Sequence, residues 1–128
     1  MSEPSIERPL LWVASSKKDL MDMPDEVRRD FGFGLSQAQK GKFPDIGKPL
    51  NGFGGSSVVE LVMDHGDGTF RTVYTVRFAE IVAVLHVFQK KSKKGIKTPK
   101  QDIELVRSRL KLAEEMYKDW KNRRGKND

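Results

Sequence analysis

The chain has 128 residues, a net charge of +6, and 37% hydrophobic and 33% charged residues. Its length suits one compact domain and leaves little room for a second core, while seven Phe, two Tyr and two Trp argue against disorder throughout. The absence of cysteine excludes disulfides, thiol chemistry and cysteine-ligated zinc, and no stretch approaches the roughly 18 apolar residues of a membrane span. We expect a single cytoplasmic domain over residues 1–128, with its core at about 10–121 and no membrane partner.

The first forty residues predict a short strand followed by a helical hairpin. The apolar run LLWV at residues 10–13 is typical of a strand. Ser16 can cap a first helix, and Pro24 can open a second. The second helix should bury one stripe of residues that recur at helical spacing: Val27, Phe31, Leu35 and Ala38. This hairpin should cover one face of the core.

A loop is predicted next, at residues 41–57, because this segment is dense in Gly, Pro and Ser and has no apolar period. Four apolar residues interrupt it: Phe43, Ile46, Leu50 and Phe53. We expect these residues to pin the loop to the body of the domain rather than to contact a ligand.

Three extended runs follow the loop. SVVELVMD (57–64) and TFRTVYTVRF (69–78) flank the sequence HGDG, whose Gly66 and Gly68 suit the positive-φ positions of a hairpin turn. The third run, EIVAVLHVFQ (80–89), is rich in β-branched residues and too apolar for an edge strand, so we place it centrally. Together with the N-terminal strand, these runs predict a mostly antiparallel sheet of about four strands.

The last segment has the clearest helix signals of the chain. Thr98 fits the N-cap position, Pro99 fits the first helical position, and Gln101 completes a capping box. The helix should end near Arg124, and its apolar face is a stripe of six residues: Ile103, Val106, Leu110, Ala113, Tyr117 and Trp120. The sequence therefore predicts an α+β domain in which a small sheet packs with an N-terminal helical hairpin and a C-terminal helix.

Lysines gather where the third long strand ends and the last helix begins. Four of them follow the strand and two flank the helix start: Lys90, Lys91, Lys93, Lys94, Lys97 and Lys100. A helix N-terminus adds unpaired backbone N–H groups and a partial positive charge, so this junction favours a phosphate. A solvated loop that only keeps the protein soluble explains the lysines equally well, and charge alone does not decide between these interpretations.

The strand at 69–78 supplies two arginines and three aromatic residues. Arg71 and Arg77 have even spacing and should point to one face of the sheet. Phe70, Tyr74 and Phe78 should point to the other face. Core packing is the simpler interpretation of the two Phe residues, whereas Tyr74 suits core packing and ligand contact equally.

Taken in order, these segments resemble a known family. A VVEL strand, a glycine turn, an FRTVY strand, IVAVLHVFQKKSKK and KTPKQDIELVRSRL are similar to the HigB-type, phage-derived branch of the RelE/ParE superfamily of bacterial toxins. The resemblance covers about residues 10–118, and its most specific block is a strand ending in His-x-Phe-x-Lys-Lys, followed by Thr-Pro at a helix start. It implies a RelE-like α+β fold and the toxin of a type II toxin–antitoxin pair.

The resemblance also implies an activity and partners. Such toxins are usually mRNA endonucleases that act on the ribosome, use neither a metal nor a cofactor, and are silenced by a cognate antitoxin. We expect the antitoxin to be a helix-turn-helix protein. Operator DNA would be contacted only through the toxin–antitoxin complex.

RNA cleavage without a metal needs cations, because negative charge develops as the 2′-hydroxyl attacks the adjacent phosphate. By the resemblance, Arg71 is the candidate phosphate clamp, and Lys90 and Lys91 would stabilise the transition state. Tyr74 would stack on a base or orient the phosphate. Flanking phosphates would be held by the remaining cations: Lys93, Lys94, Lys97 and Arg77. Glu60 can pair with Arg71 or Arg77 across the hairpin and orient it.

The two histidines are weaker candidates. His86 suits a general base because its ordinary pKa lies near neutrality. Its position inside a strand, with Val84 and Phe88 on the same face, favours a packed histidine instead. His65 lies in the turn between two aspartates, where a simple turn is favoured over a metal site, so we predict no metal.

One position departs from the family pattern. Members often show Leu-Arg-Glu-Leu on the first hairpin strand, whereas this chain has Val59 in place of the arginine, which removes a cationic contact. Three functions stay open: an mRNA-cleaving toxin, a toxin that acts on a protein target such as DNA gyrase, and a non-toxic basic nucleic-acid-binding protein. A small adjacent gene for a helix-turn-helix protein would favour either toxin.

Overall fold

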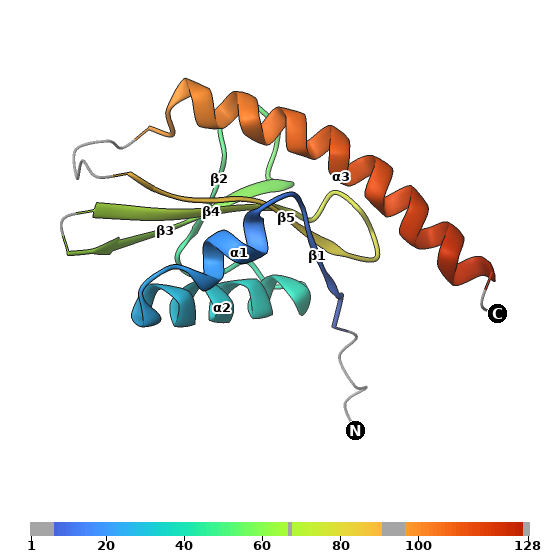
Figure 1. The fold of residues 1–128 in the computed structure, drawn as a ribbon, viewed down its shortest axis with the longest axis horizontal. Coiled ribbons are helices and arrows are strands. Elements are labelled where there is room, and N and C mark those ends of the chain that lie inside the picture. The colour runs from blue at the N-terminus through green and yellow to red at the C-terminus, as the bar shows by residue number, and fades with distance from the viewer. Residues whose placement is uncertain (1–6, 67, 91–96, 127–128) are drawn as a thin grey trace.

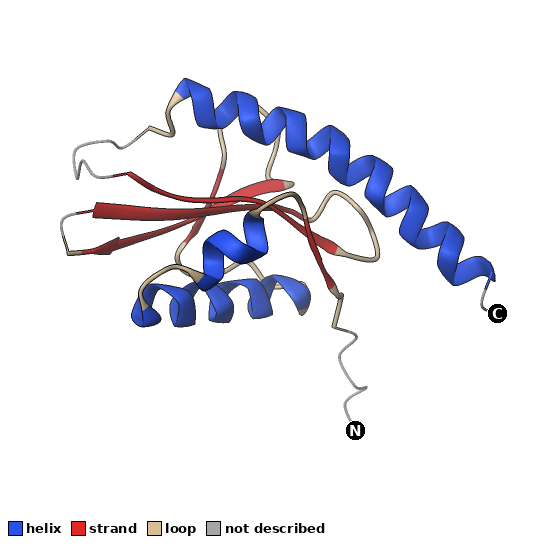
Figure 2. Cartoon of the chain, in the orientation of Figure 1, coloured by secondary structure: helices blue, strands red, loops and turns tan. Residues whose placement is uncertain are grey.

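The computed structural model describes residues 7–66, 68–90 and 97–126. It contains a five-stranded sheet in the order β1-β5-β4-β3-β2, with two helices on one face and a long helix on the other (Figures 1 and 2). This confirms the predicted α+β class and the mostly antiparallel sheet. The predicted catalytic residue Lys91 and the predicted RNA-binding residues Lys93 and Lys94 lie outside the described residues.

Three of the four strand pairings in the sheet are antiparallel. β3 (Val58–His65) and β4 (Gly68–Thr75) form the predicted hairpin, and β5 (Val82–Lys90) pairs with the other side of β4. β1 (Leu10–Trp12) lies parallel to β5 at one edge. The prediction of about four strands misses β2 (Gly47–Pro49), which pairs with β3 inside the segment predicted as a loop.

The turn between β3 and β4 uses its two glycines differently. Gly66 has a φ of 61°, as its predicted place in a hairpin turn requires. Gly68 instead opens β4, and a Cβ atom there would lie 2.7 Å from Gln89 Nε2. That amide is the flexible end of a side chain and can move, but the Lys90 carbonyl oxygen of β5 would also lie 3.2 Å from the Cβ atom, so glycine at this second position suits the close approach of β5 and not a positive φ.

The helical hairpin consists of α1 (Ser16–Met21) and α2 (Asp25–Gln39), which lie on one side of the sheet (Figure 1). All four residues of the predicted α2 stripe are buried in a core that also contains Leu61 and Tyr74. Pro24 directly precedes α2, as predicted. Ser16 is wrong as a cap because it is the first residue of α1, and Ser15 precedes it.

The long helix α3 (Lys100–Lys126) crosses the opposite side of the sheet (Figure 1). Val106 and Ala113 are fully buried, and the other residues of the predicted stripe pack around them. The helix starts two residues after Thr98, and the Pro99 carbonyl accepts its first backbone bonds, so the predicted N-cap at Thr98 is wrong. No helix in the described chain, α3 included, is long and apolar enough to cross a membrane.

The loop before β3 is only partly pinned to the core. Leu50 is buried, and Phe53 and Ile46 pack against core residues, as predicted. Phe43 is 50% exposed, so the prediction that it pins the loop is wrong.

A register shift between β4 and β5 decides which side chains face the start of α3. Val73 pairs with His86 but Tyr74 pairs with Val84, which leaves Leu85 as an extra residue in β5. Leu85 packs in the core under α3, and His86 contacts α3 side chains, whereas Val84 packs in the core under α2. The prediction that Val84 shares a face with His86 is therefore wrong.

Candidate functional site

A buried ion pair lies between the sheet and the start of α3. Glu60 and Arg71 are only 1% and 2% exposed, and Arg71 Nη1 donates a 2.9 Å hydrogen bond to Glu60 Oε1. Glu60 pairs directly with Val73, two residues beyond Arg71, so the charged side chains are diagonal neighbours on one face of the sheet. Of the two arginines proposed as its partner, Glu60 therefore contacts Arg71.

Thr98 completes this cluster from the side of the helix. Its hydroxyl oxygen accepts a 3.2 Å hydrogen bond from Arg71 Nη1, and the hydroxyl donates a short hydrogen bond to Glu60 Oε2. The side chain that sequence reasoning assigned to a helix cap thus connects two strands to the start of α3. We call Glu60, Arg71 and Thr98 the polar cluster.

A pocket of about 340 Å³ opens beside the polar cluster, and we call it the Glu60 pocket. Lys48 and Asn51 line it from β2 and the loop after it, and Lys97 and Thr98 line it from the segment just before α3. Lys48 Nζ lies 3.8 Å from Glu60 Oε1, and the lysine side chain is about half exposed. The pocket therefore places two lysines around a buried carboxylate.

Stability alone is a weak explanation for this arrangement. Burying two ions costs several kcal/mol per ion, and the attraction between them offsets this cost only when the remaining polar atoms are also satisfied. An apolar pair of similar volume would often stabilise the sheet as well or better. A buried ion pair at the wall of a pocket with two lysines is instead the kind of convergent polar group that marks a binding or catalytic site.

A second polar group joins β5 to the first turns of α3. His86 Nε2 lies 2.8 Å from Asp102 Oδ1, and Arg109 Nη1 lies 3.3 Å from His86 Nδ1. Burial lowers the pKa of His86 below its ordinary value of 6.5, and the charge of Arg109 acts in the same direction, against the hydrogen bond with Asp102. The Phe88 ring stacks on the imidazole, with ring centroids 4.4 Å apart.

This environment gives His86 the features of a packed histidine. Arginine can only donate hydrogen bonds, so neutral His86 accepts from Arg109 at Nδ1 and donates from Nε2 to Asp102. Both ring nitrogens are then occupied in anchoring α3. The residue does not line the Glu60 pocket.

Two of the predicted lysines share the side of the sheet that carries the polar cluster. Lys90 pairs with Thr69, two residues beyond the pair of Arg71 and Phe88, so strand alternation places its side chain on the face of Arg71. Lys97 is exposed and lines the Glu60 pocket.

Tyr74 and Arg77 are not brought to this pocket. Tyr74 is 1% exposed in the core under α2, on the opposite face from Arg71, and burial raises its pKa well above the ordinary value of 10.0. Arg77 lies beyond the end of β4, where its guanidinium donates to the Phe53 carbonyl. Phe78 packs under α3 instead of beside Tyr74, because β4 ends at Thr75 and the predicted alternation stops there.

His65 lies at the end of β3, in contact with α2. Its Nδ1 atom is 3.3 Å from Glu26 Oε2, and its ring meets the edge of Phe70. Within the part of the chain that the structure describes, His, Asp and Glu side chains form no group of three or more that could hold a metal ion.

The fold has the arrangement that the RelE-like resemblance implies: a small sheet between a helical hairpin and a long C-terminal helix. A family model described as phage-derived protein Gp49-like (DUF891) matches residues 18–111, a segment that includes the whole polar cluster. The chain therefore belongs to the Gp49-like family, which is part of the RelE/ParE-like toxin superfamily. No curated protein matches the chain.

Proposed function

We propose that this chain is a HigB-like toxin of a type II toxin–antitoxin pair, and that it cleaves ribosome-bound mRNA in the cytoplasm without a metal ion. The observation that carries the proposal is the polar cluster of Glu60, Arg71 and Thr98 at the wall of a pocket that also has Lys48 and Lys97. Membership of a family within a toxin superfamily supports the class of function.

The polar cluster changes the role expected for Arg71. With 2% exposure, its guanidinium is enclosed rather than open to a phosphate. We propose that the phosphate first contacts Lys48 and Lys97, and that a phosphate oxygen then replaces the Thr98 hydroxyl as acceptor for Arg71 Nη1. This exchange requires the Thr98 side chain to move, so RNA binding and the position of Thr98 would be coupled.

The reaction itself needs one proton acceptor and one proton donor. The 2′-oxygen forms a bond to phosphorus and the bond to the 5′-oxygen breaks, which leaves a 2′,3′-cyclic phosphate and a 5′-hydroxyl. Among the described residues that line the Glu60 pocket, Glu60 is the carboxylate, so we propose it as acceptor of the 2′-hydroxyl proton. The Lys97 ammonium would donate to the 5′-oxygen, and Lys90 would add positive charge on the same face.

Expression of the chain in a bacterium, with RNA 5′ ends mapped across the transcriptome, tests this function. In-frame mRNA cuts that disappear in the Lys48→Gln/Lys97→Gln variant would support the nuclease. An SOS response with intact mRNA would select inhibition of DNA gyrase instead. Normal growth with intact mRNA would select the non-toxic nucleic-acid-binding protein.

We also propose a helix-turn-helix antitoxin as the partner, with operator DNA contacted only through the complex. A net charge of +6 gives an acidic segment of such a partner a complementary surface. Co-expression with the adjacent gene is the test. The proposal fails if that gene product neither co-purifies with the chain nor relieves growth arrest.

A further inference from the structure

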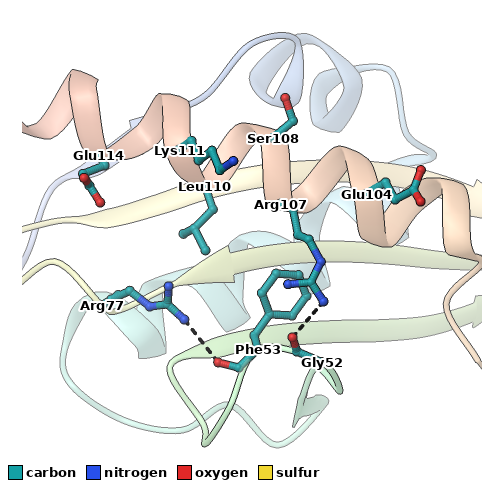
Figure 3. A pocket seen from close by; sticks show the side chains of 9 residues that line it. All are labelled: Gly52, Phe53, Arg77, Glu104, Arg107, Ser108, Leu110, Lys111 and Glu114. Atoms are coloured by element: carbon teal, nitrogen blue, oxygen red, sulfur yellow. Dashed lines mark hydrogen bonds between the residues drawn. The ribbon is translucent and has the colours of Figure 1, made fainter.

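A second and larger pocket, of about 610 Å³, lies further along α3 (Figure 3). We call it the Phe53 pocket. Phe53 comes from the loop before β3, Arg77 from the segment after β4, and Arg107, Leu110 and Lys111 from the middle of α3. Figure 3 shows the Leu110 side chain pointing into the space between the two guanidinium groups.

Both guanidinium groups of this pocket are held in place by the loop. The Arg107 guanidinium lies over the Phe53 ring at 4.6 Å from its centroid, and Nη2 donates a 2.9 Å hydrogen bond to the Gly52 carbonyl. Arg77 Nη2 donates a 3.3 Å hydrogen bond to the Phe53 carbonyl (Figure 3). Since a guanidinium has five N–H donors, each can still bind a ligand while it remains fixed to the loop.

The Phe53 pocket and the Glu60 pocket share one boundary. Asn51 and Ile103 line the Glu60 pocket, whereas the next residues, Gly52 and Glu104, line the Phe53 pocket. Along α3, the interval from Ile103 to Leu110 corresponds to about 10 Å at the usual helical rise. This distance is roughly the length of three stacked nucleotides, so one RNA strand can reach both pockets.

We propose that the Phe53 pocket binds a nucleotide of the same single-stranded RNA that enters the Glu60 pocket. This inference rests on the proposed function and adds a binding site to it. A base stacks on the pair formed by Phe53 and Arg107, and the neighbouring phosphates contact Arg77 and Lys111. Such a site tolerates every base, because stacking does not depend on base identity.

Two carboxylates also line the Phe53 pocket, Glu104 and Glu114. They lie to either side of the central space in Figure 3 and repel phosphate where they stand. They can accept hydrogen bonds from the amino groups of a base. Figure 3 places Glu104 on the side of Arg107 and Glu114 on the side of Arg77. Glu104 can therefore bind a base stacked on Phe53 and Arg107. Glu114 instead weakens the attraction of Arg77 for a phosphate.

The test measures binding of 2′-O-methyl RNA, which cannot be cleaved, as a dinucleotide and as an octanucleotide. Phe53→Leu keeps an apolar side chain but removes the ring, and Arg77→Gln removes one charge. Each should weaken octanucleotide binding by about 10-fold, because the longer strand spans both pockets. Dinucleotide binding should weaken less, because a dinucleotide can still bind at the Glu60 pocket. Arg77→Gln should also reduce the salt dependence of octanucleotide binding by about 0.7 in the logarithmic slope.

Lys40→Gln is the matched control, because it removes one charge from the end of α2, on the opposite side of the sheet. If the folded Phe53→Leu and Arg77→Gln variants bind the octanucleotide with the affinity of the wild-type chain, the inference is overturned. If those variants bind normally while Lys48→Gln/Lys97→Gln abolishes cleavage, the proposed function stands and only this inference fails. A poly-glutamate peptide tests whether the surface binds an acidic protein instead of RNA. If the wild-type chain binds this peptide but neither the dinucleotide nor the octanucleotide, the proposed function and this inference both fail.

Discussion

Arg71 Nη1 donates a 3.2 Å hydrogen bond to Thr98 Oγ1, although 27 positions separate the two residues. Strand β4 and the start of α3 thus meet at one hydroxyl group, which also bonds to Glu60. Thr98 lines the Glu60 pocket, whereas Arg71 is 2% exposed and does not line it, so under the proposed function a phosphate oxygen would replace the Thr98 hydroxyl as the acceptor for Arg71 Nη1.

The Thr98 hydroxyl should contribute to stability as well as to the site. Thr98→Val keeps the shape of the side chain, but it should lower the free energy of unfolding by about 1–3 kcal/mol, because two buried charged groups lose a partner. Thr98→Ser keeps the hydroxyl and should stay close to wild type. Urea unfolding of the two variants compares them, and equal stability would show that these hydrogen bonds contribute nothing.

Breaking the ion pair on one side should cost more than replacing it. Glu60→Ala leaves Arg71 buried without its carboxylate and should lower the free energy of unfolding by about 3–5 kcal/mol. The double change Glu60→Leu/Arg71→Met should recover much of that loss, since an apolar pair needs no charge partner. A double variant less stable than Glu60→Ala would mean that the pair is retained for stability, against our interpretation of the site.

Two glycines of α2 should respond in opposite ways to alanine. A Cβ atom at Gly32 would meet nothing within 4 Å, whereas at Gly34 it would lie 3.0 Å from Leu61 Cδ1. Gly32→Ala should raise the free energy of unfolding by about 0.5–1 kcal/mol, because alanine loses less conformational entropy in a helix. Gly34→Ala should be less stable than Gly32→Ala by about 1 kcal/mol or more, since Leu61 must move. Thermal melts that place the two variants together would contradict the packing of α2 on β3.

His86 should make stability depend on pH. Its pKa is lowered in the folded state, so the unfolded chain binds the proton more readily. The contribution of His86 is therefore fully present above its unfolded pKa, near the ordinary value of 6.5, and is lost as the pH falls through the lower folded pKa.

Urea unfolding at about pH 7.5 and pH 5 checks this dependence. The loss of stability at the lower pH should be smaller in His86→Gln than in the wild type. An identical loss in His86→Gln would show that the acid sensitivity comes from other groups.

The main elements could be predicted from the sequence because their signals are local and repeated. The α2 and α3 stripes each follow the helical period over many residues, and the three long strands are extended runs rich in β-branched and aromatic residues. β2 has no such signal: its three residues, GKP, become a strand only by pairing with β3. The sequence also could not predict which neighbours share a face of the sheet with His86, because the extra residue Leu85 becomes visible only in the pairing of β5 with β4.

The candidate site could be predicted only where its residues carry a local signal in the sequence. Glu60 and Arg71 stand out as charges inside apolar strands, and their pairing follows from hairpin geometry. Lys48 and Thr98 were missed because they reach the site only through contacts between distant segments. Tyr74 was predicted for the site but lies in the core under α2. Strand alternation predicts that Tyr74 and Arg71 lie on opposite faces of the sheet, but it does not predict which of the two faces carries the site.

Cleavage of ribosome-bound mRNA by the purified chain, freed of metal ions with EDTA and dialysed before the assay, tests the central claim most directly. The wild type should release fragments with 5′-hydroxyl ends, and Lys40→Gln should match its rate. Lys48→Gln/Lys97→Gln should cleave about 100-fold more slowly or worse, because it removes the two charges that the proposed function places at the reacting phosphate. Both lysines are exposed, so the melting temperature should stay close to wild type. Undiminished cleavage by the folded double variant, or no cleavage by the wild type, would contradict the account.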